Sequence, residues 1–131
     1  MKKKTFYIIT VLAMLVAVAC SKKPFDDEGR LITTRNDSYI TFFDLLGPDN
    51  RTVLVANSTV IDTAAGTVTA VAKFGTNMQH LKPYSSLAID AIMQPGMGEW
   101  VDFSQPRKYT VISGSRKVKK EYTFTISLQG Q

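Results

Sequence analysis

The dominant hydrophobic pattern beyond residue 30 has a period of two, with apolar and polar side chains alternating along the chain. It is clearest over residues 121–128 (EYTFTISL), where aromatic and aliphatic side chains alternate with threonine and serine. Successive side chains of a strand point to opposite faces, so this segment is predicted to be a half-buried antiparallel strand. Residues 109–112 are its predicted hairpin partner. The turn between them is Ser113-Gly114-Ser115, in which Gly114 is expected to take a positive φ.

Four further strands are predicted upstream, separated by segments rich in Gly, Pro and Asn. They cover residues 38–46, 51–61, 67–74 and 86–93. Six or seven short strands at a spacing of about 10–12 residues are typical of a β-sandwich, and no convincing helical periodicity follows residue 20. The predicted fold class is therefore all-β, an antiparallel β-sandwich of about seven strands.

The first 19 residues have the pattern of an export signal. Three lysines follow Met1, and residues 5–19 (TFYIITVLAMLVAVA) are an uncharged apolar run. A membrane-spanning helix needs about 20 apolar residues, so this run is short for a span and suited to a signal peptide. Residues 1–19 are predicted to be removed.

The end of this signal, Ala17-Val18-Ala19-Cys20, resembles the lipobox of bacterial lipoproteins. The resemblance implies that the Cys20 thiol is acylated, that cleavage precedes it, and that lipid holds the mature chain on a membrane. Ser21, at the position where Asp would direct retention, implies the outer membrane. The alternative is an ordinary secreted protein in which Cys20, the only cysteine, is a buried thiol.

Residues 20–30 are polar, contain Pro and Gly, and lack any period, so they are predicted to form a flexible tether before a domain at 31–131. The acidic run Asp26-Asp27-Glu28 could suggest a metal site. Calcium requires six to eight oxygen ligands in a folded loop, however, so a solvated tether is the favoured interpretation and no metal is expected.

Composition limits the classes of function. The chain of 131 residues is long enough for one domain, and its single cysteine excludes an internal disulfide framework. Three of the 16 basic residues belong to the predicted signal, which leaves 13 basic and 11 acidic residues and a net charge of +2. An exported chain of such low charge is not expected to bind nucleic acid.

Several short motifs of the domain together resemble one known family. They are Gly66-Thr67-Val68, Phe74-Gly75-Thr76-Asn77, Leu81-Lys82-Pro83, the run 101–106 (VDFSQP), Tyr109-Thr110-Val111, and the run 122–126 (YTFTI). In this order they are similar to small Ig-like domains of Bacteroidetes lipoproteins, often found at the membrane end of surface glycan-binding proteins. The resemblance covers about residues 38–128 and implies an Ig-like sandwich associated with carbohydrate.

Residues that could support catalysis are few. The only histidine, His80, has no second histidine or cysteine in the domain with which to bind a metal, so an exposed turn residue is expected. A glycosidase needs two carboxylates in a cleft, and the candidates Asp90, Glu99 and Asp102 are close only in sequence. We therefore predict a non-catalytic protein without a cofactor.

Two features are candidate ligand-binding groups. Trp100, the only tryptophan, follows a Gly-rich turn and could stack on a sugar ring; alternatively it closes the end of the sandwich as part of the core. Lys108, Lys117 and Lys119 are predicted on the solvent face of the last hairpin. They could bind an anionic lipid or glycan, although lysine is also the usual protection of an edge strand.

Asp62-Thr63-Ala64 resembles the short motif at which Bacteroidetes envelope proteins are O-glycosylated, which makes Thr63 a candidate modification site. The leading functional hypothesis is a lipid-anchored outer-membrane module, exposed or facing the periplasm, that assists surface carbohydrate binding. The alternative is an adhesion or assembly subunit that docks onto an envelope protein by strand addition.

Overall fold

The computed structural model describes residues 23–131, so the predicted signal peptide and Cys20 lie outside the described residues. The chain divides into two compact units, Met1–Ile32 and Thr33–Gln131. No helix within residues 23–131 is long and apolar enough to cross a bilayer.

The described part of the first unit contains a small hairpin. Phe25 and Leu31 form an antiparallel bridge, and the Ile32 N–H donates to the Pro24 carbonyl at 2.7 Å. The Arg30 guanidinium pairs with Asp26 at 2.9 Å and with Glu28 at 2.6 Å. Two residues of the acidic run, Asp26 and Glu28, thus have a local ionic partner in Arg30.

The second unit contains seven strands, which confirms the predicted all-β class. The strands are β1 (Ile40–Leu46), β2 (Val60–Asp62), β3 (Thr67–Ala72), β4 (Lys82–Leu87), β5 (Ile92–Gln94), β6 (Arg107–Ile112) and β7 (Lys119–Leu128). No helix occurs within residues 23–131.

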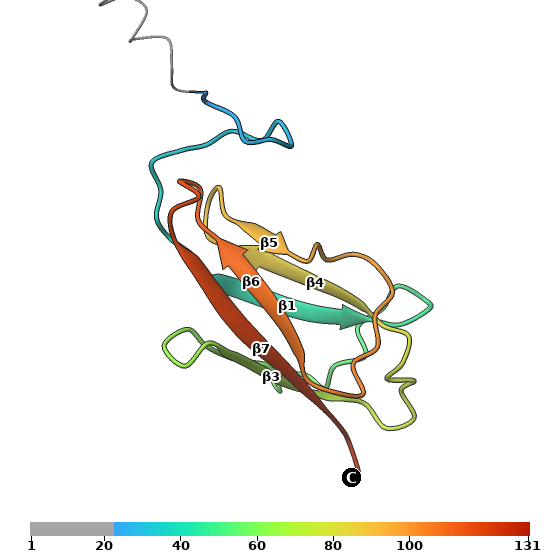
Figure 1. Ribbon diagram of the computed structural model, residues 1–131. Coiled ribbons are helices and arrows are strands. Elements are labelled where there is room, and N and C mark those ends of the chain that lie inside the picture. The colour runs from blue at the N-terminus through green and yellow to red at the C-terminus, as the bar shows by residue number, and fades with distance from the viewer. Residues whose placement is uncertain (1–22) are drawn as a thin grey trace, which may run out of the picture. The chain divides into compact units, whose positions relative to one another are not determined.

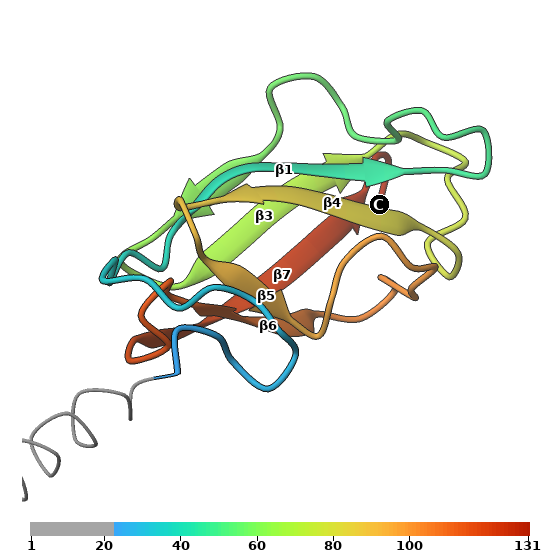
Figure 2. The same cartoon turned by 90° about the horizontal axis from the view of Figure 1, so that it is seen from above.

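The strands form two layers (Figures 1 and 2). β1 and β4 make a two-stranded antiparallel sheet, and the other five form a sheet in the order β2-β3-β7-β6-β5. Within the larger sheet β3 and β7 are parallel, whereas a wholly antiparallel sandwich was expected. Alternation of side chains defines the faces of a strand but not the direction of its neighbour, so the pattern could not reveal this pair.

The core lies between the two layers and is built around β7. Tyr122 and Phe124 are fully buried, as their alternation predicts. The Phe124 ring packs edge-on against Phe43 of β1 at 5.0 Å and against Tyr109 of β6 at 5.1 Å, measured between ring centroids. These contacts join the two sheets through three large aromatic side chains, and each of them buries a large apolar area.

Two predicted strands differ from those observed. Residues 51–61 were expected to be one strand, but only β2 at their end is regular. Before it the chain changes sheets, because the Val53 N–H donates to the Leu45 carbonyl of β1 whereas the Val55 N–H donates to the Val71 carbonyl of β3. No periodic pattern marks a segment whose hydrogen bonds pass from one layer to the other within a few residues.

The predicted strand 86–93 is also wrong in its bounds, because β4 ends at Leu87, a turn follows, and β5 begins at Ile92. β4 begins earlier and includes Pro83, which pairs with Leu45. The Leu45 carbonyl accepts from Val53, on the side away from β4. The Leu45–Pro83 pair therefore makes no hydrogen bond between the strands, and the N–H that proline lacks is not needed.

Gly114 in the β6–β7 turn does not have the positive φ that was expected; Arg116 has it instead, with φ 64°. Glycine is required at position 114 for space. A Cβ there would clash with the Thr33 hydroxyl and lie 2.8 Å from the Asp90 Cβ. The turn packs closely on the chain that leads into the sandwich, and the Thr33 N–H donates to the Gly114 carbonyl at 2.9 Å.

The sandwich has two poles. The Gly114 pole, formed by residues 33–36, 88–91 and 113–116, is where the chain joins the sandwich. The Trp100 pole, formed by residues 77–81 and 100–104, lies at the opposite ends of β4 and β6. β7 runs from the first pole to the second, and the C-terminus follows it there (Figure 1).

Candidate functional site

The outward face of the β1–β4 sheet carries exposed aromatic side chains. Phe42 of β1 lies opposite Ser86 of β4, and Asp44 lies opposite Tyr84. Directly opposed residues point to the same face, so Phe42 and Tyr84 share the solvent side of this sheet. Their rings are 48% and 54% exposed, and they meet edge-on at 6.1 Å between centroids.

Trp100 extends this face toward the Trp100 pole. Leu81 and Val101 form an antiparallel bridge with hydrogen bonds of 2.7 and 3.0 Å, which places Trp100 opposite Lys82. The indole stacks on the His80 ring, with 4.3 Å between centroids and 11° between planes. The Lys82 ammonium lies 4.6 Å from the indole centroid, within the range of a cation–π contact.

Trp100 is therefore not a core residue, because 41% of it is exposed and its ring contacts involve two polar side chains. Lys82 and Tyr84 alternate onto the same side of β4, and His80, in the bend before the strand, joins them through its stacking on Trp100. We call the resulting surface the aromatic face. It consists of Phe42, His80, Lys82, Tyr84 and Trp100.

The other outward surface of the sandwich, on the five-stranded sheet, has a different composition. Its solvent side is dominated by hydroxyl groups; the threonines are Thr67, Thr69, Thr110, Thr123 and Thr125. This is the ordinary composition of a solvated sheet surface. Exposed rings gathered on the smaller sheet thus need a separate explanation, since contiguous exposed apolar surface marks binding sites.

The predicted basic residues are exposed but do not form one compact patch. Lys108 lies near the beginning of β6, whereas Lys119 pairs with Ile112 at the end of that strand, and Lys117 lies in the β6–β7 turn. Four residues of strand separate the two ends by about 13 Å. The Lys108 ammonium also lies 3.2 Å from the Glu121 carboxylate, which offsets its charge.

Two of the three candidate carboxylates, Asp90 and Asp102, lie at opposite poles of the sandwich, too far apart for a catalytic pair. Asp90 lies at the Gly114 pole, 3.6 Å from the Arg35 guanidinium, while Asp102 lies at the Trp100 pole. Asp102 accepts hydrogen bonds from the Ser104 hydroxyl at 2.6 Å and the Ser104 N–H at 2.8 Å. These bonds lower the pKa of Asp102, which is opposite to the raised pKa that a general acid needs.

Within residues 23–131, no three or more His, Cys, Asp or Glu side chains come together in a group that could hold a metal ion. His80 is exposed in a bend, as expected, with its ring against Trp100. Thr63 is exposed in the β2–β3 turn, and its modification stays a prediction.

Sequence reasoning identified Trp100 but missed Phe42 and Tyr84. Phe42 and Phe43 are adjacent, and a register irregularity between Ile40 and Phe42 changes which of them faces the core. Tyr84 directly follows a proline, a residue that normally argues against a strand. The sequence signal that could have placed Tyr84 on an exposed strand face was the alternation of Lys82, Tyr84 and Ser86 with Pro83 and Ser85.

The comparison with known families gives this surface a context. Residues 51–126, more than half of the chain, match the family model described as SGBP, N-terminal. The chain therefore belongs to this family of N-terminal modules of starch- or surface-glycan-binding proteins, and the predicted resemblance is confirmed at the level of the family. No curated protein sequence matches it at a significant level.

Two solved structures share the fold. A protein of Bacteroides fragilis, provisionally described as secreted, is 17% identical with a TM-score of 0.55, over 71% of this chain and 96% of that one. A protein of Bacteroides thetaiotaomicron, provisionally described as a glycoside hydrolase, is 23% identical with a TM-score of 0.56. The match covers 72% of this chain but only 26% of that protein, so it concerns the fold of one part of it.

Proposed function

We propose that this protein is a non-catalytic, lipid-anchored module of the outer membrane that contacts carbohydrate through its aromatic face. The observation that carries the proposal is the gathering of Phe42, Tyr84 and Trp100 on one outward surface in a member of a glycan-binding family. Sugar rings present weakly positive C–H groups, and the faces of aromatic rings are negative, so the two stack favourably.

The affinity of this face for a free sugar should be weak. An aromatic contact contributes about 0.5–1.5 kcal/mol beyond burial, and the proposed face offers three exposed rings. Because binding also restricts motion of the ligand, a dissociation constant near the millimolar range is expected, about 4 kcal/mol. A membrane-bound array of such modules would hold a long polysaccharide through many weak contacts.

The lipid anchor is part of the same proposal. The chain joins the sandwich at the Gly114 pole, so acyl groups on Cys20 would attach the module at that pole. The Trp100 pole lies at the other end of β4, which leaves the indole remote from the point of attachment. This polarity suits a module that presents a glycan-binding surface outward.

Calorimetric titration of the domain with soluble polysaccharides tests the role of the aromatic face. Binding should be insensitive to salt and should fall at least five-fold in Trp100→Ala. The matched control is Phe74→Ala, which removes an exposed ring, 82% accessible, outside the aromatic face. Equal losses in both variants would contradict a specific site.

The exposed basic residues test the alternative that the ligand is anionic. If the ligand is anionic, binding should weaken steeply with salt and should be lost when Lys108, Lys117 and Lys119 are all changed to Gln. No binding of any polysaccharide or anionic lipid would favour the alternative function, an adhesion or assembly subunit with an envelope protein as its partner.

A further inference from the structure

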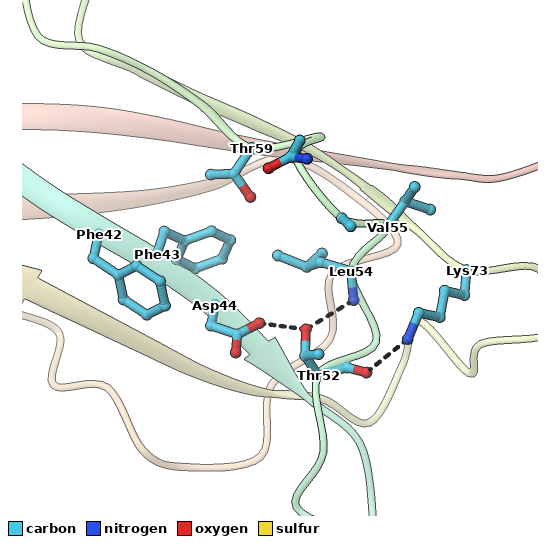
Figure 3. A pocket seen from close by; sticks show the side chains of 10 residues that line it. Phe42, Phe43, Asp44, Thr52, Leu54, Val55, Thr59 and Lys73 are labelled. Carbon is cyan, nitrogen blue, oxygen red and sulfur yellow. Dashed lines mark hydrogen bonds between the residues drawn. The ribbon is translucent and has the colours of Figure 1, made fainter.

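A hollow of about 290 Å³ lies beside β1, between this strand and residues 52–59 (Figure 3). It exists because residues 51–53 pair with the end of β1 and the chain then departs to β3, leaving β1 uncovered near Phe43. An adjoining hollow of about 310 Å³ shares Phe42, Phe43, Asn57 and Thr59 with it. Ligand pockets span about 300–1,000 Å³, so the space suits one small ring.

The polar side of the hollow is held in place before any ligand binds. Asp44 Oδ1 accepts from the Thr52 hydroxyl at 2.5 Å and from the Leu45 N–H at 2.7 Å. The Thr52 hydroxyl in turn accepts from the Leu54 N–H at 3.2 Å. Both bonds to Asp44 fall on one carboxylate oxygen, which leaves Oδ2 as an acceptor for a ligand hydroxyl.

The other walls supply apolar surface and further polar groups. The apolar wall consists of Phe42, Val55 and Ala56, backed by the core side chains Phe43 and Leu54. Thr59 lies across from Asp44 on the loop, and Asn57 also lines the hollow. The Lys73 ammonium donates to the Thr52 carbonyl at 3.5 Å. The mainly apolar lining, together with the polar side chains of Asp44, Asn57 and Thr59, suits a ring with one C–H face and several hydroxyls.

Phe42 connects this hollow to the aromatic face. Its ring contacts Tyr84 on the outward side of the sheet and also lines the hollow. From the level of Lys82, beside Trp100, to the level of Ser86, opposite Phe42, the sheet extends about 13 Å. A chain of a few sugars that stacks on Trp100 and Tyr84 would therefore reach the mouth of the hollow.

We propose that the hollow lined by Asp44, Thr52 and Asn57 binds one neutral pyranose unit, the terminal or branch residue of a glycan lying on the aromatic face. This inference rests on the proposed function for the remainder of the glycan. The hydroxyl groups of the unit donate to Asp44 Oδ2 and to the Asn57 amide oxygen, while its C–H face packs on the apolar wall. No bond is made or broken.

The test uses the methyl glycopyranosides of glucose, galactose and mannose, titrated into the ¹⁵N-labelled domain and followed by amide chemical shifts. At least one glycoside should shift amides of residues 45 and 52–59 with a dissociation constant in the millimolar range. Asp44→Asn should weaken this binding at least five-fold. Asp62→Asn, which alters an exposed carboxylate at the end of β2, should not.

Two further variants separate the possible failures. Asn57 has φ 58°, so Asn57→Gly removes the amide while keeping the backbone conformation. This variant should weaken binding of the methyl glycoside, and it keeps the test informative if Asp44→Asn does not fold. Trp100→Ala should reduce binding of an oligosaccharide, whereas the methyl glycoside should still shift the amides of residues 45 and 52–59 in that variant.

Oligosaccharide binding that depends on Trp100, without shifts at 52–59 and unaffected by Asp44→Asn, would overturn the pyranose site and leave the proposed function standing. Binding of an extended (Thr-Val)₄ peptide in place of every glycoside would also overturn it, since the uncovered edge of β1 would then be a strand-addition site.

Discussion

Asp102 shows how the surroundings of one residue determine its chemistry. It lies in a tight turn in which Ser104 donates two hydrogen bonds to its carboxylate, and the charge of Arg107 adds to their effect. All three interactions favour the ionised form and lower the pKa of Asp102 below its ordinary value. The carboxylate thus orders the turn that follows Trp100.

The pKa of Asp102 should rise toward its ordinary value in Ser104→Ala, because the strongest of these hydrogen bonds is lost. A carboxylate with a depressed pKa adds stability above its unfolded-state pKa, and that stability is lost as the pH falls through the folded-state pKa. The variant should therefore lose less stability on acidification than the wild type. Carbon-13 NMR titration of the carboxylate measures the shift, with Thr125→Ala on the opposite sheet as the control. An unchanged midpoint in Ser104→Ala would contradict the assignment.

At the scale of the elements, the β2–β3 hairpin depends on a close approach to β7. Gly66 has φ 69°, and its carbonyl accepts from the Thr123 N–H at 2.9 Å. A Cβ at this position would lie 2.7 Å from the Glu121 carbonyl oxygen, which belongs to the backbone of β7 and cannot easily move. The first residues of the parallel β3–β7 pair are therefore aligned by a glycine.

Gly66→Ala should destabilise the domain through both backbone strain and this clash, by about 2–3 kcal/mol. The matched control is Gly75→Ala. Gly75 has φ 80°, but a Cβ there meets nothing within 4 Å, so only the strain of about 1 kcal/mol applies. Urea unfolding of the two variants isolates the clash as their difference. Equal urea midpoints for the two variants would mean that the β2–β3 turn moves away from β7 without a loss of stability.

The elements also show how much could be predicted from the sequence. β7 and β3 were predicted closely because each buries one whole face, so its alternation survives along the strand. The segment 51–61 was not predicted correctly, because its hydrogen bonds change from one sheet to the other after two residues. The strand β4 was not predicted correctly either, because its proline occupies a position in the strand that needs no N–H. The sequence singled out Trp100 as a candidate but did not reveal whether it is exposed or part of the core, and the partners Phe42 and Tyr84 depend on cross-strand register.

For the whole molecule, the arrangement of the ends is the important feature. The chain joins the sandwich at the Gly114 pole, where the Ser115 N–H donates to the Arg35 carbonyl and the Ser115 hydroxyl bonds to Asn36 at 2.6 Å. β7 then carries the chain across the length of the sandwich to the Trp100 pole, about 30 Å for ten residues. The sandwich unit therefore begins and ends at opposite poles.

The last prediction concerns Cys20, the residue through which the chain is proposed to be anchored to the membrane. Acylation at Cys20 should make the mature protein partition into detergent and carry a mass increase equal to its acyl groups, because several chains at about 0.8 kcal/mol per buried CH₂ bind a membrane almost irreversibly. Cys20→Ser should abolish incorporation of a labelled fatty acid and release the protein or leave its precursor uncleaved. Ser21→Ala, which alters the neighbouring residue but keeps the thiol, should retain the label. A wild-type protein recovered from the medium with an intact mass lacking acyl groups would show instead that Cys20 is an ordinary thiol of a secreted chain.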